Sequence, residues 1–430
     1  MESKYQDFHI NNPEPKKRVD DEILDWIAPT AKSKHEESLD SSHLDNGLNI
    51  GLLRSEYNLA KNLASEPDET LRKKMEYKYE VQLLALLGKY TQDTDRPLAE
   101  RQMWADEFTK KSVKIYGGLD EKLVREIDGG GKNLEKTMEK YVPIFDEVRE
   151  FLEEKYGAVL DKLGLDDREE KVDAPEIFTK FSTAFAELKN RDPRFDGWEV
   201  EVKPDATSLS VNADDKRIYI GEKRAAAKPA NLKGLFAHEV LRHAVSAVNM
   251  KNLGIDEALP NYISSEEGFA KIYEMAISGN RNVKISAGNY SDIGWVLGQI
   301  DGRRHSRAEL IPRKIERKAK SGKEITDGMR KTAENSAARI FRGTPGNDEV
   351  SGFFTKDIAY FGGLIDDLEW ILGEEKSGKN ISEILEYSSA AKFNVNDETQ
   401  NKYVKSRMFA KYVLKDSGIL QISAPKNQKK

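Results

Sequence analysis

One segment, Leu235–Met275, constrains the fold and the chemistry of the chain more than any other. It contains His238, Glu239 and His243 and, further on, the adjacent pair Glu266 and Glu267. Two imidazoles and one carboxylate from neighbouring helices form a zinc site with an open fourth position, and a Glu next to the first His is placed to act as a base. The segment therefore predicts two packed helices, one with both histidines and one with the glutamates.

The spacing of the two histidines predicts an irregular helix. His238 and His243 are five residues apart, whereas the common zinc-peptidase motif HExxH places its histidines four apart. At about 100° per residue, an ideal α-helix would leave the second imidazole about 140° away from the first. A single π-bulge, with i→i+5 hydrogen bonding, absorbs the extra residue and brings both imidazoles to one side. We therefore expect such a bulge in a buried helix whose apolar positions are Leu235, Phe236, Val240, Leu241, Ala244, Val245 and Val248.

The carboxylate expected as the third ligand is Glu267. It lies in the stretch EEGFAKIYEMA, whose apolar residues recur at helical spacing: Phe269, Ile272, Tyr273 and Ala276. This helix can pack against the histidine helix and bring Glu267 to the two imidazoles, while Glu266 is placed to orient one of them from behind. The alternative is a chance HExxxH on an ordinary core helix that binds no metal.

HEVLRH followed by EEGFA resembles the gluzincin peptidases, in which the Glu of an xEGxA segment is the third zinc ligand. A closer resemblance is to the family whose bacterial members carry a QEGLA motif and whose animal members are the microtubule-associated tyrosine carboxypeptidases. The resemblance covers roughly residues 46–415 and rests on further matches: Phe108, Ser112, Tyr116, Gly117, Val211–Ala213, Asn249, Arg342–Gly343, Phe354–Asp357 and Tyr360. The chain differs from the family pattern at Leu241–Arg242, Ser246 and Phe269. These differences spare the metal ligands and fall on the expected substrate pocket.

The resemblance implies removal of a C-terminal residue from a peptide or protein. Asn249 would support the metal ligands, and Asn212, in the strand before the metal helix, would line the substrate cleft. The chain-terminal carboxylate needs a cation, and Arg342 and Lys356 are the candidates. Tyr360 matches the family position of the hydroxyl that stabilises the oxyanion. For each of these residues an ordinary packing or surface role is the alternative.

Apolar periodicity predicts an α+β fold that is predominantly α-helical. Residues 1–45 are expected to be a flexible polar arm, 46–171 a helical scaffold layer, 172–415 the zinc metallopeptidase catalytic region and 416–430 a basic tail. Alternating β-branched segments at 198–202, 208–211 and 217–220 predict a small antiparallel sheet just before the metal-binding helix. The resemblance adds the expectation of a gluzincin-like core around that helix.

Composition restricts the chemistry and the environment. The chain has no cysteine, which excludes disulfides, thiolate ligands and a cysteine nucleophile. Charged residues make up 33% of the chain and hydrophobic residues 38%, and no apolar run approaches the ~18 residues of a membrane span. A cytoplasmic protein without membrane contact is therefore expected. The net charge of -6 gives no support for a nucleic-acid partner.

The predicted function is zinc-dependent peptide hydrolysis with one Zn²⁺ per chain, of the carboxypeptidase type that the resemblance implies. Glu239 would take a proton from a water on the metal and deliver one to the leaving amine. Endopeptidase and aminopeptidase activity stay open, as do the substrate and the oligomeric state. The alternative from another class is a non-catalytic or regulatory zinc-binding module that keeps the peptidase fold. A helical protein without metal is the third hypothesis.

Overall fold

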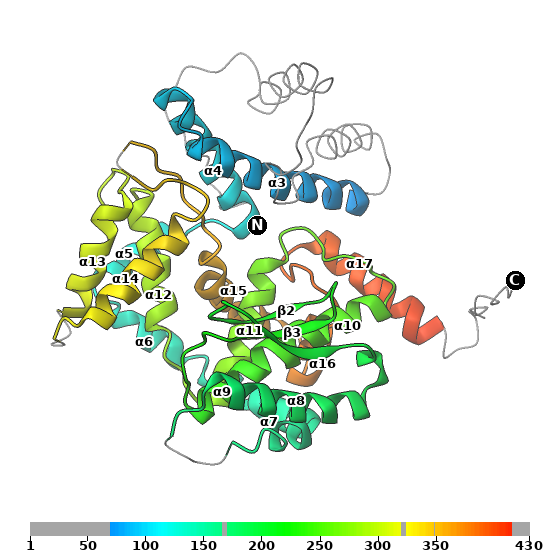
Figure 1. Cartoon of the computed structure of the whole chain (residues 1–430). Helices are drawn as coiled ribbons and strands as arrows, with labels where there is room; N and C mark the ends of the chain where they lie inside the picture. Colours follow the sequence, from blue (N-terminus) through cyan, green and yellow to red (C-terminus); the bar gives the residue numbers. More distant parts are fainter. Residues whose placement is uncertain (1–68, 166–169, 320–323, 348, 415–430) are drawn as a thin grey trace, which may run out of the picture. The chain divides into compact units, whose positions relative to one another are not determined.

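The computed structural model describes residues 69–165, 170–319, 324–347 and 349–414 (Figure 1). The chain divides into two compact units. Among the described residues, the first contains Glu69–Gly118 together with Ser306–Phe354, and the second contains Leu119–His305 together with Thr355–Leu414. This division differs from the sequential ranges predicted above, because each unit is assembled from two separate stretches of chain. The predicted arm and basic tail lie outside the described residues.

The described part of the first unit is helical. Its helices are α3 (Glu69–Gln92), α4 (Leu98–Tyr116), α13 (Arg307–Ala319) and α14 (Asp327–Ile340). α3 packs against α4 through a buried apolar cluster that includes Leu83, Leu87, Trp104 and Phe108, and α13 packs against α14. α3 and α4 are therefore helical, as predicted for this part of the 46–171 layer, and each buries an apolar face against the other.

The second unit contains the remaining helices and the sheet. Before the sheet lie α5 (Glu121–Asp128), α6 (Lys132–Glu139), α7 (Val142–Asp161), α8 (Ala174–Arg191) and the short 3₁₀ turn η2 (Pro193–Phe195). After it follow α9 (Pro229–Phe236), η3 (Ala237–Ala244), α10 (Val245–Asn252), α11 (Ile263–Ser278), α12 (Lys284–Val296), α15 (Ile358–Lys376), α16 (Ile381–Ser388), α17 (Glu398–Met408) and η4 (Phe409–Leu414). The predominantly helical α+β class is therefore confirmed. None of the described helices is both long and apolar enough to cross a membrane.

The sheet is mixed, so the prediction of an antiparallel sheet is wrong in one of its two pairings. Its strands are β1 (Glu199–Lys203), β2 (Leu209–Asn212) and β3 (Arg217–Gly221), in the order β1-β3-β2. β2 pairs antiparallel with β3, but β1 pairs with β3 in parallel. The link from β1 to β2 passes over the end of β3, where a Cβ on Gly221 would lie 2.4 Å from the carbonyl oxygen of Ala206. Since the chain reverses twice between β1 and β3, these two strands must run in the same direction.

Helix α11 lies at the centre of the second unit and packs against α7, α9, η3 and α15 (Figure 1). Its crossing with α15 is close because two glycines face the partner backbone. A Cβ on Gly268 would lie 2.4 Å from the carbonyl oxygen of Gly363, and one on Gly363 would lie 2.1 Å from that of Ser264. The Gly of the EEGFA motif is therefore required by packing, and this packing fixes the residues on either side of it.

Candidate metal centre

The histidines lie on a helix that is continuous from α9 through η3 to α10, and η3 is π-helical. The predicted π-bulge is thus confirmed, and it extends over Ala237–Ala244. The wider turn brings the rings of His238 and His243 to a centroid distance of 4.9 Å, nearly perpendicular at 83°. In a regular α-helix the two rings would point to different sides. The five-residue spacing therefore puts both imidazoles at one point.

Glu267 on α11 meets these two rings. Its Oε2 lies 3.6 Å from Nε2 of His238 and 3.6 Å from Nε2 of His243. All three side chains are buried, and their possible ligand atoms lie within 4.8 Å of one another. This buried Oε2 accepts no hydrogen bond, which is costly for a carboxylate unless another group satisfies it. The group could therefore hold a metal ion, and two nitrogens with one oxygen are donors that suit zinc.

Two further carboxylates lie behind the imidazoles. Nδ1 of His243 donates to Glu266 Oε1 at 2.8 Å, which is the hydrogen bond predicted between Glu266 and a ligand ring. Nδ1 of His238 donates to Glu274 Oε2 at 3.0 Å. Sequence reasoning missed Glu274, although it follows Glu267 by seven residues and so lies on the same face of α11. With both Nδ1 atoms engaged, each ring presents Nε2 to the same point.

A fully buried guanidinium supports Glu266. Arg242 ion-pairs with Glu266 Oε2 at 3.0 Å, donates to the Ser388 hydroxyl at 3.1 Å, and lies over the Phe269 ring at 4.7 Å. Lys392 lies 3.5 Å from the other oxygen of Glu266. Three of the positions that differ from the family pattern, Arg242, Ser246 and Phe269, are fully buried. Of these, Arg242 acts on the centre through Glu266 and so through His243.

The buried imidazoles and carboxylates shift one another's pKa values. Burial alone would lower the pKa of His238, but the carboxylates of Glu267, Glu274 and Glu239 outweigh it and raise that pKa to about 10. Burial also opposes charge on His243, yet its carboxylate neighbours raise the pKa. Burial would raise the pKa of Glu267, but the two imidazoles hold it well below its usual range. Without a metal, therefore, protons on the imidazoles balance the carboxylates.

The two outer carboxylates are held ionised by cations. Burial would raise the pKa of Glu266, but Arg242, Lys392 and His243 lower it to about 2. For Glu274, burial is likewise outweighed by His238 and by Lys271, whose ammonium lies 2.7 Å from Oε1, and the pKa falls to about 2. Both groups are therefore permanent hydrogen-bond acceptors for the imidazoles at neutral pH.

Two of the predicted functional residues, Glu239 and Lys356, adjoin the metal group. Glu239 follows the first histidine, is half-buried, and makes no hydrogen bond within the described part of the chain. Lys356 lies 3.6 Å from Oε1 of Glu267, whereas Oε2 is the oxygen that lies near both imidazoles. Tyr360 follows Lys356 by four residues at the start of α15 and is half-buried. A base and a cation thus accompany the ligands.

The other three predicted residues are engaged elsewhere. Asn212 accepts hydrogen bonds from the backbone of Asp214 and Asp215 and so closes the β2–β3 turn. Asn249 donates to the Ser389 carbonyl at 2.9 Å and accepts from Arg194 at 2.8 Å. Arg342 belongs to the first unit, where its guanidinium lies 5.6 Å from the Phe354 ring centroid. None of these contacts involves a residue of the metal group.

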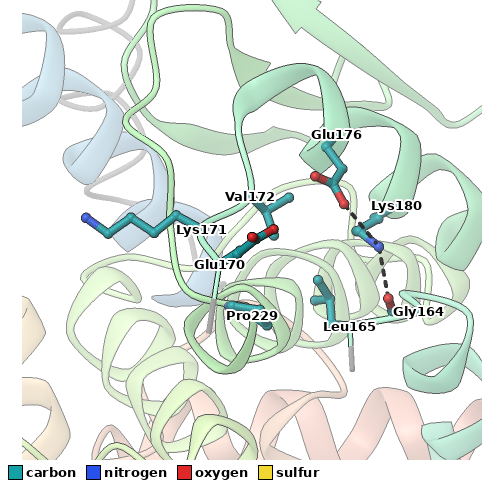
Figure 2. A pocket seen from close by; sticks show the side chains of 8 residues that line it. All are labelled: Gly164, Leu165, Glu170, Lys171, Val172, Glu176, Lys180 and Pro229. Carbon is teal, nitrogen blue, oxygen red and sulfur yellow. Dashed lines mark hydrogen bonds and ion pairs between the residues drawn. The ribbon is translucent and has the colours of Figure 1, made fainter. Parts of the chain in front are cut away.

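A small cavity elsewhere in the second unit is not part of this centre. It lies between the start of α8, the start of α9 and the residues that follow α7, and its volume is about 30 Å³ (Figure 2). Lys180 closes one side by bonding the Gly164 carbonyl at 2.9 Å and pairing with Glu176 at 3.5 Å. The space admits water but not a peptide side chain.

A comparison with protein-family models matches no family, and a comparison with curated proteins finds no relative. The functional argument therefore rests on the residues of the centre.

Proposed function

We propose that this protein is a zinc-dependent peptidase of the HExxxH/QEGLA type with a gluzincin-like core, acting as a carboxypeptidase. The observation that carries the proposal is the buried oxygen of Glu267, 3.6 Å from two imidazole nitrogens and without a hydrogen-bond donor. Glu239, which directly follows His238 and makes no hydrogen bond within the described residues, is the candidate base. A purely structural zinc site is normally closed by a fourth protein ligand and has no use for such a base.

In this proposal His238, His243 and Glu267 hold the ion. Zinc bound there would lower the pKa of a water molecule towards ~7 and polarise a carbonyl group. Glu239 takes the proton of the attacking water and delivers a proton to the leaving amine. Glu266 and Glu274 keep a proton on Nδ1 of each ring, so that each Nε2 lone pair faces the ion. When an ion displaces the Nε2 protons, each ring is therefore left in the tautomer that binds the ion.

Two features support a peptide as the substrate. β2 is an edge strand of the sheet and packs against η3, so an extended peptide adding to that edge would run beside the histidines. Lys356 places a positive charge next to Glu267, where negative charge develops on the scissile carbonyl. Tyr360 supplies a hydroxyl at the start of the same helix, in the role of an oxyanion donor.

Metal content and turnover test the proposal together. Elemental analysis is expected to find one zinc per chain in the wild type and none in His243→Ala. Glu239→Gln is expected to keep the zinc and to lose about 10²- to 10⁴-fold in hydrolysis of a panel of peptides with varied C-termini. Glu154→Gln, the same change at an exposed position of α7, is the control and should keep both.

The outcomes separate the hypotheses. Peptidase activity that survives in Glu239→Gln would refute the assignment of the base. Zinc bound without hydrolysis of any peptide would favour the non-catalytic zinc-binding module, and a wild-type protein that folds without binding zinc would remove both.

A further inference from the structure

The two oxygens of Glu267 have different neighbours. Oε2 lies 3.6 Å from Nε2 of His238 and 3.6 Å from Nε2 of His243. Oε1 lies 3.6 Å from the ammonium of Lys356, which precedes α15 by two residues. No other lysine and no arginine of the described residues is paired with Glu267. One oxygen therefore faces the imidazoles, and the other faces a single lysine.

The distances on the imidazole side fit a single oxygen ligand. Zinc binds nitrogen and oxygen at about 2.0–2.2 Å, so two corners of a tetrahedral site are about 3.4 Å apart. Both distances from Oε2 to the imidazole nitrogens are 3.6 Å, so this oxygen alone can fill one corner beside the two histidines. A carboxylate can also bind a metal through both oxygens. In that case Oε1 would take up room at the fourth position, which the proposed reaction needs open.

The charge on Lys356 opposes this second mode of binding. It compensates the charge on Oε1 and repels a divalent cation that approaches this oxygen. Glu274 is held in the same way, because its Oε2 faces His238 and its Oε1 lies 2.7 Å from the ammonium of Lys271. The side chain of Lys356 is 35% exposed, whereas that of Glu267 is 11% exposed, so the lysine meets the carboxylate from the solvent side.

We propose that Lys356 is a positioning residue that limits Glu267 to one metal-binding oxygen and so keeps the fourth position open. This inference rests on the proposed function and deepens it, because it names the residue that prevents the chain from closing the centre. In this role Lys356 acts through Glu267, and the proton transfers stay with Glu239.

The number of ligands on the bound ion tests the inference without turnover. X-ray absorption at the zinc edge is expected to give four ligands in the wild type and five in Lys356→Met, in which Oε1 joins Oε2. Lys356→Arg, which keeps the charge, should restore four. Lys376→Met, the same change at an exposed position near the end of α15, is the control and should leave four. Since Met keeps the length of the side chain and Lys356 is partly exposed, the fold should be unchanged.

Cobalt loading and zinc affinity give two further readouts. Four-coordinate Co²⁺ absorbs visible light more strongly than five-coordinate Co²⁺, so the band of cobalt-loaded protein should weaken in Lys356→Met and recover in Lys356→Arg. Loss of a positive charge beside the ion should raise the zinc affinity of Lys356→Met about tenfold in a chelator competition assay. A lysine that only stabilised the local fold would have the opposite effect, because a loosened centre binds zinc more weakly.

Equal ligand numbers in the wild type and Lys356→Met, or a weaker zinc affinity in the variant, overturns the inference. Peptide hydrolysis separates it from the proposed function. A Lys356→Met protein that keeps four ligands and cleaves peptides at the wild-type rate removes only this inference. A ligand number that depends on Lys356, in a protein that cleaves no peptide, removes only the peptidase proposal, and a wild type that binds no zinc removes both.

Discussion

Zinc uptake by this centre is expected to release protons. The pKa of His238 in the metal-free protein is raised to about 10, so at pH 7 the ring carries a proton that zinc must displace. At pH 7, three units below this pKa, displacing the proton costs 1.36 kcal/mol per unit, so the apparent free energy of zinc binding is reduced by about 4 kcal/mol. His243 also has a raised pKa and adds a second proton. Apparent zinc affinity should therefore rise at least tenfold per pH unit from pH 7 upward.

The raised imidazole pKa values also predict that the stability of the metal-free protein falls with pH while the stabilisation by zinc grows. A raised imidazole pKa stabilises the metal-free fold fully below pH ~6.5, the unfolded value, and this contribution is lost as pH rises through the folded value. The Tm of metal-free protein should therefore fall from pH 6.5 towards pH 10, while the increase in Tm on adding zinc should grow over the same range.

Calorimetry in two buffers of different ionisation enthalpy measures the proton count directly. Between one and two protons should be released per zinc at pH 7, because both rings have raised pKa values and the pKa of Glu267 is already low. Mg²⁺, which prefers oxygen ligands, is the control and should release none. Zinc binding without proton release at pH 7, or with an affinity that does not change between pH 7 and pH 9, would refute this reasoning.

Three substitutions test the surroundings of the centre. Glu274→Gln should weaken zinc binding about 10- to 100-fold in a chelator competition assay, because it removes the charged acceptor that orients the His238 ring. Glu154→Gln, the same change at an exposed position, is the control and should leave the affinity unchanged. Equal zinc affinities for the two variants would contradict the orienting role of Glu274. Gly268→Ala should cost about 2 kcal/mol or more in urea unfolding, because its Cβ would lie 2.3 to 2.4 Å from atoms of α15. Gly157→Ala, at an open position of α7, should instead gain about 0.5–1 kcal/mol, and similar effects at both sites would count against the packing argument. Burial raises the pKa of Asp367 well above its usual range, so the folded protein keeps a proton that the unfolded chain loses as the pH rises. The free energy of unfolding of the wild type should therefore fall, relative to that of Asp367→Asn, by about 1.4 kcal/mol per pH unit between pH ~5 and the raised pKa. Thermal unfolding between pH 5 and pH 8 measures this, and parallel profiles would show that the carboxyl ionises freely.

The sequence predicted those parts of the site that local geometry determines. The five-residue spacing of the histidines requires a widened turn if both are to share an ion, and η3 has it. The hydrogen bond from Glu266 to an imidazole follows from its place next to Glu267 on one helix. Both predictions depend on separations of a few residues, over which helical geometry leaves little freedom.

The parts that were missed depend on tertiary pairing. The alternation of apolar and polar residues identified the strands but not the direction in which they pair, since the same pattern suits a parallel or an antiparallel neighbour. Lys392 reaches Glu266 from the far C-terminal part of the chain, where no periodicity marks it. Asn212, by contrast, has a local role that the sequence could have predicted. Its side chain closes the β2–β3 turn, a role typical of Asn before a turn that could have been read from VNADD.

The charges around the centre alternate outward in a way that suits a divalent metal ion better than protons alone. Arg242 and Lys271 lie behind Glu266 and Glu274, and they keep those carboxylates ionised. Each carboxylate therefore accepts the Nδ1 proton of its imidazole without removing it, and the Nε2 atoms remain directed at Glu267. In the metal-free protein, protons on the imidazoles face the shared oxygen of Glu267, and they occupy the same nitrogens that would bind an ion. A divalent cation with nitrogen and oxygen ligands satisfies all three groups at once, so the outer cations act on metal affinity through the tautomers of the two rings.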